Sequence, residues 1–113
     1  MITYLKMNSH SKYNAKKTVI ENITFSSRKE ASRYQELKLL EDAGEISDLQ
    51  LQKVYELIPK GKGERSAKYL ADFVYREAGK VIVEDCKGFR TRDYILKRKL
   101  MKWLYPELIF RES

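Results

Sequence analysis

The clearest pattern of hydrophobic and polar positions lies in the second half of the chain. Residues 69–76 and 80–87 are rich in β-branched and aromatic side chains, as is typical of strands. The segment 77–79 between them, Glu-Ala-Gly, carries residues that suit a tight turn. The pattern therefore predicts a β-hairpin with antiparallel arms.

The turn also fixes which residues should face each other across this hairpin. If Arg76 stands opposite Val81, then Asp72 stands opposite Asp85. Side chains alternate along a strand, so Asp85 should share a face with Val81, and Glu84 should point to the other face. Two carboxylates about 5 Å apart, in an effective dielectric near 20, repel each other by roughly 3 kcal/mol. Either a hard cation such as Mg²⁺ binds between them, or a neighbouring lysine or arginine neutralises Asp72.

A helix is expected before the hairpin, over about residues 28–42. Ser27 and Glu30 have the S-x-x-E spacing of a capping box, and Gly44 suits the end of the helix. Glu30 also heads an apolar stripe, continued by Tyr34, that should face the sheet. Its carboxylate therefore either caps the backbone amide of Ser27 or serves a site.

A second helix is expected after the hairpin, from Thr91 to about Tyr105. Its helical wheel separates an apolar arc, expected to pack, from a basic arc, expected to face outward. The apolar arc consists of Leu96, Leu100, Trp103 and Leu104, and the basic arc of Arg98, Lys99 and Lys102. Lys97 lies at the edge of the apolar arc, from which it could reach the acids of the hairpin.

Shorter strands complete the expected architecture. They fall at 18–20 and 23–25, as a small hairpin, at 46–51 and 54–58, as two strands or one bent strand, and at 108–110. Residues 1–17 are polar and basic without a clear period, so we expect a flexible arm there. No linker divides the remainder, which leaves one domain over residues 18–113.

Composition limits the chemistry that this domain could perform. With 113 residues, of which 42% are hydrophobic, the chain can bury a modest core. The only cysteine, Cys86, and the only histidine, His10, exclude an intramolecular disulfide and a Cys/His zinc site. Any catalysis must therefore rely on carboxylates and lysine, with or without a metal ion. No run reaches the ~18 apolar residues of a membrane helix, so we expect a cytoplasmic protein without membrane contact.

The net charge of +7 is unevenly distributed along the chain. Residues 1–29 carry six basic side chains and one acidic one, and residues 87–102 carry seven basic side chains and one acidic one. Residues 30–58 between them hold three basic and seven acidic side chains. Such clusters are typical of proteins that bind nucleic acid, although an ordinary solvated surface could also produce them.

The order of elements, with acids on both hairpin arms and a lysine two residues after the second acid, resembles the PD-(D/E)XK nuclease superfamily. Ala71-Asp72 stands in the position of PD, with alanine in place of proline, and Asp85-Cys86-Lys87 stands in that of (D/E)XK. Together with segments 12–17 and 25–30, these motifs make nearly the whole chain similar to a family of small phage- and prophage-encoded proteins of that superfamily.

The resemblance implies a fold and a cofactor. The fold would be α/β with an α+β-like order of elements, a restriction-endonuclease-like core and a mixed central sheet. Asp72 and Asp85 would bind Mg²⁺, for which Mn²⁺ could substitute, and the backbone carbonyl of Cys86 would be a further ligand. Glu84 adjoins Asp85 and is the other acid that could face the metal, although the alternation of side chains favours Asp85.

The resemblance also implies an activity, that of a metal-dependent DNA endonuclease hydrolysing phosphodiester bonds. Lys87 would position the attacking water and the phosphate, and Glu30 would be the acid contributed by the first helix. Hydrolysis of this kind needs no histidine, because a bound cation polarises the phosphate and lowers the pKa of bound water. If the resemblance holds, Glu30 serves a site and could cap the helix as well.

The expected partner is DNA, in branched or recombination intermediates, cut by a phage-type enzyme in the cytoplasm of the bacterial host. A homodimer is expected by analogy alone. The contacts to DNA are expected from Lys12, Lys16, Lys17, Lys60, Lys62, Arg90, Arg92, Lys97, Arg98, Lys99 and Lys102. One alternative is a noncatalytic DNA-binding module that retains the nuclease fold, and another is an interaction protein with a merely basic surface.

Overall fold

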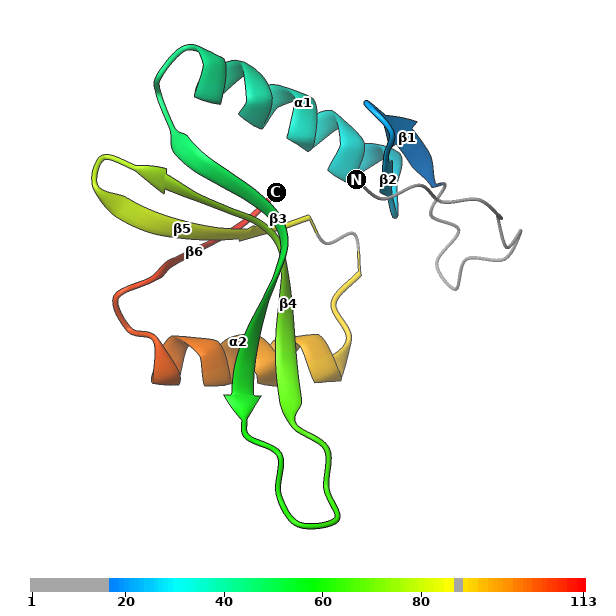
Figure 1. The fold of residues 1–113 in the computed structure, drawn as a ribbon, viewed down its shortest axis with the longest axis vertical. Helices are drawn as coiled ribbons and strands as arrows, with labels where there is room; N and C mark the ends of the chain where they lie inside the picture. Colours follow the sequence, from blue (N-terminus) through cyan, green and yellow to red (C-terminus); the bar gives the residue numbers. More distant parts are fainter. Residues whose placement is uncertain (1–16, 87–88) are drawn as a thin grey trace.

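The computed structural model describes residues 17–86 and 89–113, which form two helices and two sheets (Figure 1). In chain order the elements are β1 (Thr18–Ile20), β2 (Ile23–Phe25), α1 (Arg28–Asp42), β3 (Ser47–Ile58), β4 (Ala67–Glu77), β5 (Lys80–Asp85), α2 (Arg92–Leu104) and β6 (Ile109–Glu112). The fold is thus mixed α/β, as expected. Neither helix in these ranges has the length and hydrophobicity that a membrane-spanning segment requires.

The larger sheet has four strands in the order β3, β4, β5 and β6. Neighbours among β3, β4 and β5 pair antiparallel, whereas β6 runs parallel to β5, so the predicted mixed sheet is confirmed. β1 and β2 form the expected small hairpin, which lies beside the start of α1 (Figure 1). The segments expected at 46–51 and 54–58 are parts of one continuous strand, β3.

The hairpin of β4 and β5 has the predicted register. Arg76 pairs with Val81, and the same register carried along both strands places Asp72 opposite Asp85. The loop is a two-residue turn at positions 78–79, where both residues have a left-handed φ, of 52° and 78°. A turn of this kind matches the twist of the strands that it joins, which explains why the register could be read from the sequence.

Strands β3 and β4 twist so strongly that each contributes to two hydrophobic cores. On β4, Tyr69 and Ala71 belong to the core under α2, whereas Phe73, with the same parity, belongs to the core under α1. The faces exchange at Asp72 and at the residue opposite it on β3, Gln52, whose φ of 54° is left-handed. Figure 1 shows α1 lying along one end of the long β3–β4 ribbon and α2 crossing its other half.

Helix α1 begins and packs as predicted. The Ser27 Oγ accepts a hydrogen bond from the backbone N–H of Glu30 at 3.1 Å and caps the helix. Its buried face consists of Glu30, Ala31, Tyr34 and Leu37. The prediction that Glu30 heads the stripe facing the sheet is therefore confirmed.

The face predicted to pack on α2 is largely wrong. Three residues of the expected apolar arc are exposed: Leu96 by 57%, Trp103 by 82% and Leu104 by 43%. Of the four residues of that arc, Leu100 alone packs as predicted, and it lies in the core with the half-buried Tyr94 and the completely buried Met101. One reason is Tyr94, whose hydroxyl donates to the Glu112 Oε2 at 2.7 Å only when the ring is turned toward the sheet.

Candidate functional site

Asp72 and Asp85 lie close together at the end of the paired part of β4 and β5. The two residues are 8% and 1% exposed. The Asp85 Oδ1 accepts a hydrogen bond from the backbone N–H of Asp72 at 3.1 Å, and the Asp72 Oδ2 accepts one from the backbone N–H of Cys86 at 2.9 Å. Each carboxylate thus binds the main chain of the opposite strand, which brings the two acids together as the register predicts.

The other oxygen of Asp85 lies against the core under α2. The Tyr69 hydroxyl donates to the Asp85 Oδ2, and the Tyr69 ring stacks on that of Tyr94, with ring centres 6.4 Å apart. Burial, reinforced by this hydrogen bond, raises the pKa of Tyr69 well above its usual value. The phenol therefore stays protonated and acts as a donor to Asp85.

Glu84 points to the opposite face, toward α1, as the alternation of side chains predicts. Its buried carboxylate accepts hydrogen bonds from the Arg33 Nε at 2.5 Å, the Arg33 Nη2 at 3.0 Å and the Tyr75 hydroxyl at 2.6 Å. Burial alone would raise the pKa of Glu84, but the bonds from Arg33 and Tyr75 outweigh it and leave the pKa below its usual value. Glu84 is thus the ionised half of a buried ion pair between β5 and α1.

Glu30 does not turn back to cap the helix. Its carboxylate accepts a hydrogen bond from the Ser26 Oγ at 2.5 Å and another from the Gln52 Nε2 at 3.1 Å. Gln52 is a residue that the sequence did not single out, because a glutamine between two strand residues is unremarkable. Its place opposite Asp72 follows only from the pairing of β3 with β4.

The pKa of the Cys86 thiol reflects its burial and three carboxylates that lie near it. This pKa is raised to about 11, chiefly by burial. The hydrogen bond with Ser113 lowers this pKa, whereas the negative charges of Asp72, Glu84 and Glu30 raise it further. The Cys86 Sγ lies 2.9 Å from the Ser113 Oγ. The thiol is therefore protonated at neutral pH, in the field of carboxylates from α1, β4 and β5.

The donor chemistry of the pair suits a hard divalent cation, since Asp72 and Asp85 offer carboxylate oxygens. In the described part of the chain, however, no three His, Cys, Asp or Glu side chains are arranged to hold a metal ion. Both Asp85 oxygens accept hydrogen bonds, and Glu30 is held by Ser26 and Gln52. Lys87, the lysine expected to complete the site, lies outside the described residues.

The structure describes nine of the eleven basic residues expected at DNA; the other two are Lys12 and Lys16. Seven of the nine are exposed: Lys17, Lys60, Lys62, Arg90, Arg92, Lys99 and Lys102. Arg90 and Arg98 pair with Glu112, so Arg98 turns toward β6 and the prediction that it faces outward is wrong. Lys97 contacts Asp93, one helical turn earlier, at 3.4 Å, and this ion pair stands in place of the expected reach toward the hairpin.

Comparison with known proteins places the chain in a family. The family described as "Protein of unknown function (DUF1064)" matches residues 10–111, nearly the whole chain. Neither the curated proteins nor the solved structures contain a significant match.

Proposed function

The chain belongs to the DUF1064 family of proteins of unknown function, and we propose that it is a metal-dependent DNA endonuclease that hydrolyses phosphodiester bonds. The observation that carries this proposal is the pair of carboxylates, Asp72 and Asp85, buried together at facing positions of β4 and β5. Burying an ionised group costs several kcal/mol unless partners compensate it. Such pairs are concentrated at functional sites, and hard divalent cations are their usual ligands.

In this proposal the fold is a restriction-endonuclease-like core. Asp72, Asp85 and the backbone carbonyl of Cys86 hold Mg²⁺, or Mn²⁺ in its place. When bound, the cation would polarise the scissile phosphate and lower the pKa of the attacking water. Lys87 orients that water and the phosphate, and Glu30 supplies the acid from α1.

The substrate in this proposal is DNA, bound mainly through its backbone. The exposed cations on α2 and on the connection between β3 and β4 support it. The resemblance to small phage-encoded nucleases favours branched or recombination DNA, a homodimer, and action in the cytoplasm of a bacterial host.

A specific observation also favours a second candidate, a noncatalytic DNA-binding module. Both oxygens of Asp85 already accept hydrogen bonds, from Tyr69 and from the backbone of Asp72. A carboxylate used in this way can hold two strands together without a metal. The same basic surface would then bind DNA without cutting it.

Cleavage assays separate the two candidates. The protein is incubated with linear duplex, single-stranded and four-way-junction DNA, in EDTA and with added Mg²⁺ or Mn²⁺. We expect cleavage only with metal, and its loss in Asp72→Asn, Asp85→Asn and Lys87→Ala variants. Asp42→Asn, an exposed acid at the end of α1, makes the same change of charge and should cut normally.

Each outcome has a clear meaning. Binding of DNA without cleavage under any metal would support the noncatalytic module and reject the endonuclease. Cleavage that survives in Asp72→Asn and Lys87→Ala would reject these site residues. Circular dichroism of each variant confirms that a loss of cleavage does not reflect a loss of fold.

A further inference from the structure

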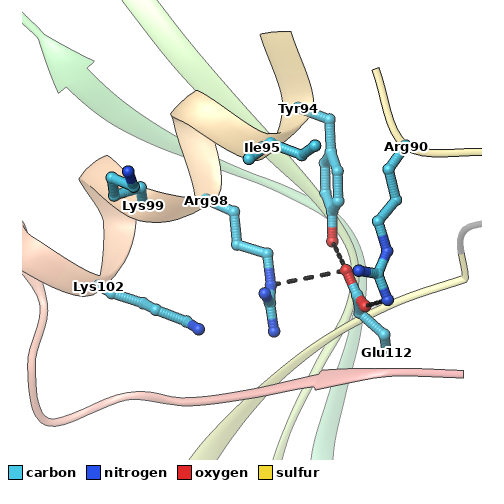
Figure 2. Close-up of a pocket in the computed structure, with 7 residues that line it drawn as sticks. All are labelled: Arg90, Tyr94, Ile95, Arg98, Lys99, Lys102 and Glu112. Carbon is cyan, nitrogen blue, oxygen red and sulfur yellow. Dashed lines mark hydrogen bonds and ion pairs between the residues drawn. The ribbon is translucent and has the colours of Figure 1, made fainter. Parts of the chain in front are cut away.

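A second site lies on the face of the molecule that carries α2. A pocket of about 290 Å³ opens between α2 and β6, close to the lower limit of roughly 300 Å³ for small-molecule sites (Figure 2). Its lining residues are Arg90, Tyr94, Ile95, Arg98, Lys99, Lys102 and Glu112. The pocket is large enough for a small anionic group with an apolar part beside it, but not for a large cofactor.

One carboxylate, that of Glu112, holds three of the side chains that line this pocket. The Glu112 carboxylate, on β6, forms ion pairs with Arg90 through Oε1 and with Arg98 through Oε2, the latter at 3.7 Å. The Tyr94 hydroxyl donates to the same Oε2 at 2.7 Å. Figure 2 shows the two guanidinium groups on either side of the carboxylate. Glu112 therefore fixes where two positive charges stand.

The pocket is left with an excess of positive charge. Its lining holds four cationic side chains, Arg90, Arg98, Lys99 and Lys102, against the one carboxylate, so its net charge is +3. Within the described residues, neither Lys99 nor Lys102 takes part in an ion pair. Tyr94 and Ile95 add apolar wall beside these cations. Such a surface favours an anion attached to a less polar group.

The pocket is joined to the candidate acids. Glu112 pairs with Asp85 in the register of β5 and β6, so the two carboxylates come from adjacent strands. Two stacked rings make a second link, since Tyr69 donates to Asp85 and Tyr94 donates to Glu112. A ligand in the pocket would therefore lie beside the acids, on the face covered by α2.

We propose that this pocket binds a backbone phosphate of DNA, with Lys99 and Lys102 as direct contacts and Glu112 as the residue that positions Arg90 and Arg98. Guanidinium forks and ammonium groups are the usual partners of phosphate oxygens, and the adjoining sugar would lie on Tyr94 and Ile95. The identity of the ligand rests on the proposed function. The anion-binding character rests on the pocket alone.

A binding assay tests the contacts without requiring cleavage. The affinity for a short fluorescein-labelled duplex is measured by anisotropy in EDTA, over a range of salt concentrations. Lys99→Ala/Lys102→Ala should weaken binding about tenfold or more and reduce the slope of log K against log salt by about one, because the pocket holds one phosphate. The matched control Lys68→Ala/Lys80→Ala removes two exposed lysines from β4 and β5 and should change affinity much less. Equal weakening in both double variants would overturn the proposal.

Removing the acid tests the positioning of the two arginines. Glu112→Gln leaves an acceptor for Tyr94 but removes the ion pairs that hold Arg90 and Arg98, so DNA should bind several-fold more weakly although the pocket gains positive charge. Glu56→Gln, at an exposed position of β3, makes the same change of charge elsewhere and should not weaken binding. An unchanged or tightened affinity for Glu112→Gln, in a protein with unaltered thermal unfolding, would contradict the assigned role of Glu112.

A titration with inorganic phosphate separates the two sources of the anion. The only tryptophan, Trp103, is exposed on α2 one residue beyond Lys102, so its fluorescence reports on this surface. If phosphate alone binds and DNA binding is indifferent to Lys99 and Lys102, the assignment to DNA is overturned. All binding is measured in EDTA, so it does not depend on cleavage. The proposal for the pocket can therefore be contradicted while the proposed cleavage is supported, and the reverse is also possible.

Discussion

Individual buried carboxylates in this protein are stabilised in two different ways. Glu84 receives two hydrogen bonds from the Arg33 guanidinium, so a cation compensates its charge inside the core. Asp85 accepts hydrogen bonds from the Tyr69 hydroxyl and from a main-chain amide, and it faces a second carboxylate, that of Asp72. Glu84 therefore has the environment of a structural ion pair, which leaves the facing acids, Asp72 and Asp85, as the proposed metal ligands.

Backbone strain and the candidate site coincide at Gln52. Its φ of 54° is left-handed, a conformation that costs a non-glycine residue roughly 1–2 kcal/mol. Glycine adopts this conformation freely, so Gln52→Gly should be more stable than Gln52→Ala by about 1 kcal/mol in urea unfolding. Both variants lose the hydrogen bond to Glu30, so both should lose cleavage activity if that bond positions Glu30.

Gln50 is the control for this prediction. It is exposed on the same strand, two residues earlier, and its φ is not left-handed. Glycine at position 50 should be less stable than alanine by roughly 0.5–1 kcal/mol, as in an ordinary strand. If alanine were also the more stable residue at position 52, the strain at Gln52 would not exist.

Among the contacts between elements, Glu41 ties the end of α1 to β3. Its Oε2 accepts a hydrogen bond from the backbone N–H of Leu49 at 3.0 Å, and its Oε1 lies 3.0 Å from the Lys38 Nζ. The bond from Leu49, followed by that from Lys38, holds the pKa of Glu41 below its usual value. The folded state has the lower pKa, so this stabilisation is present above the unfolded pKa of about 4.3 and is lost as pH falls through the folded value.

Replacing Glu41 should therefore affect stability in a pH-dependent way. We expect Glu41→Gln to lower the free energy of unfolding by about 1 kcal/mol at neutral pH, and by much less below about pH 3. Urea unfolding at both pH values measures this difference. Asp42→Asn removes the adjacent exposed acid and should produce neither effect. A loss of the same size at both pH values would show that the ionised carboxylate is not the stabilising group.

An element that is determined by its own residues can be predicted from the sequence. The two-residue turn sets the register that brings Asp72 to Asp85, and Ser27 sets the start of α1. The buried face of α2 depends instead on a partner outside the helix, because Tyr94 binds Glu112, 18 residues later. No local pattern of residues indicates such a distant contact. The position of Gln52 opposite Asp72 could not be predicted for the same reason, because it depends on how β3 pairs with β4.

In the molecule as a whole, the two cores share their strands. Tyr75 and Ile82 belong to the core under α1, whereas their neighbours Val74 and Val83 belong to the core under α2. A change in one core must therefore be felt by the strands that build the other. We infer that both halves unfold in one transition, with the candidate acids at their junction.

A substitution in one half, read out in the other, tests this inference. Leu37 is completely buried under α1, and Leu37→Ala should cost about 2–5 kcal/mol. Trp103 lies on α2, so its fluorescence reports on the opposite half. We expect the urea midpoint of Trp103 fluorescence to fall together with that of circular dichroism, because a single transition has one free energy.

Leu39→Ala provides the matched control, since Leu39 lies on the same helix but is 69% exposed. By either probe, it should change the free energy of unfolding by no more than about 0.5 kcal/mol. If Leu37→Ala left the fluorescence midpoint unchanged while circular dichroism shifted, the halves would unfold separately. The exchange of faces at Asp72 and Gln52 would then be a hinge, and a site built from Glu30 on one side and Asp85 on the other could not be rigid.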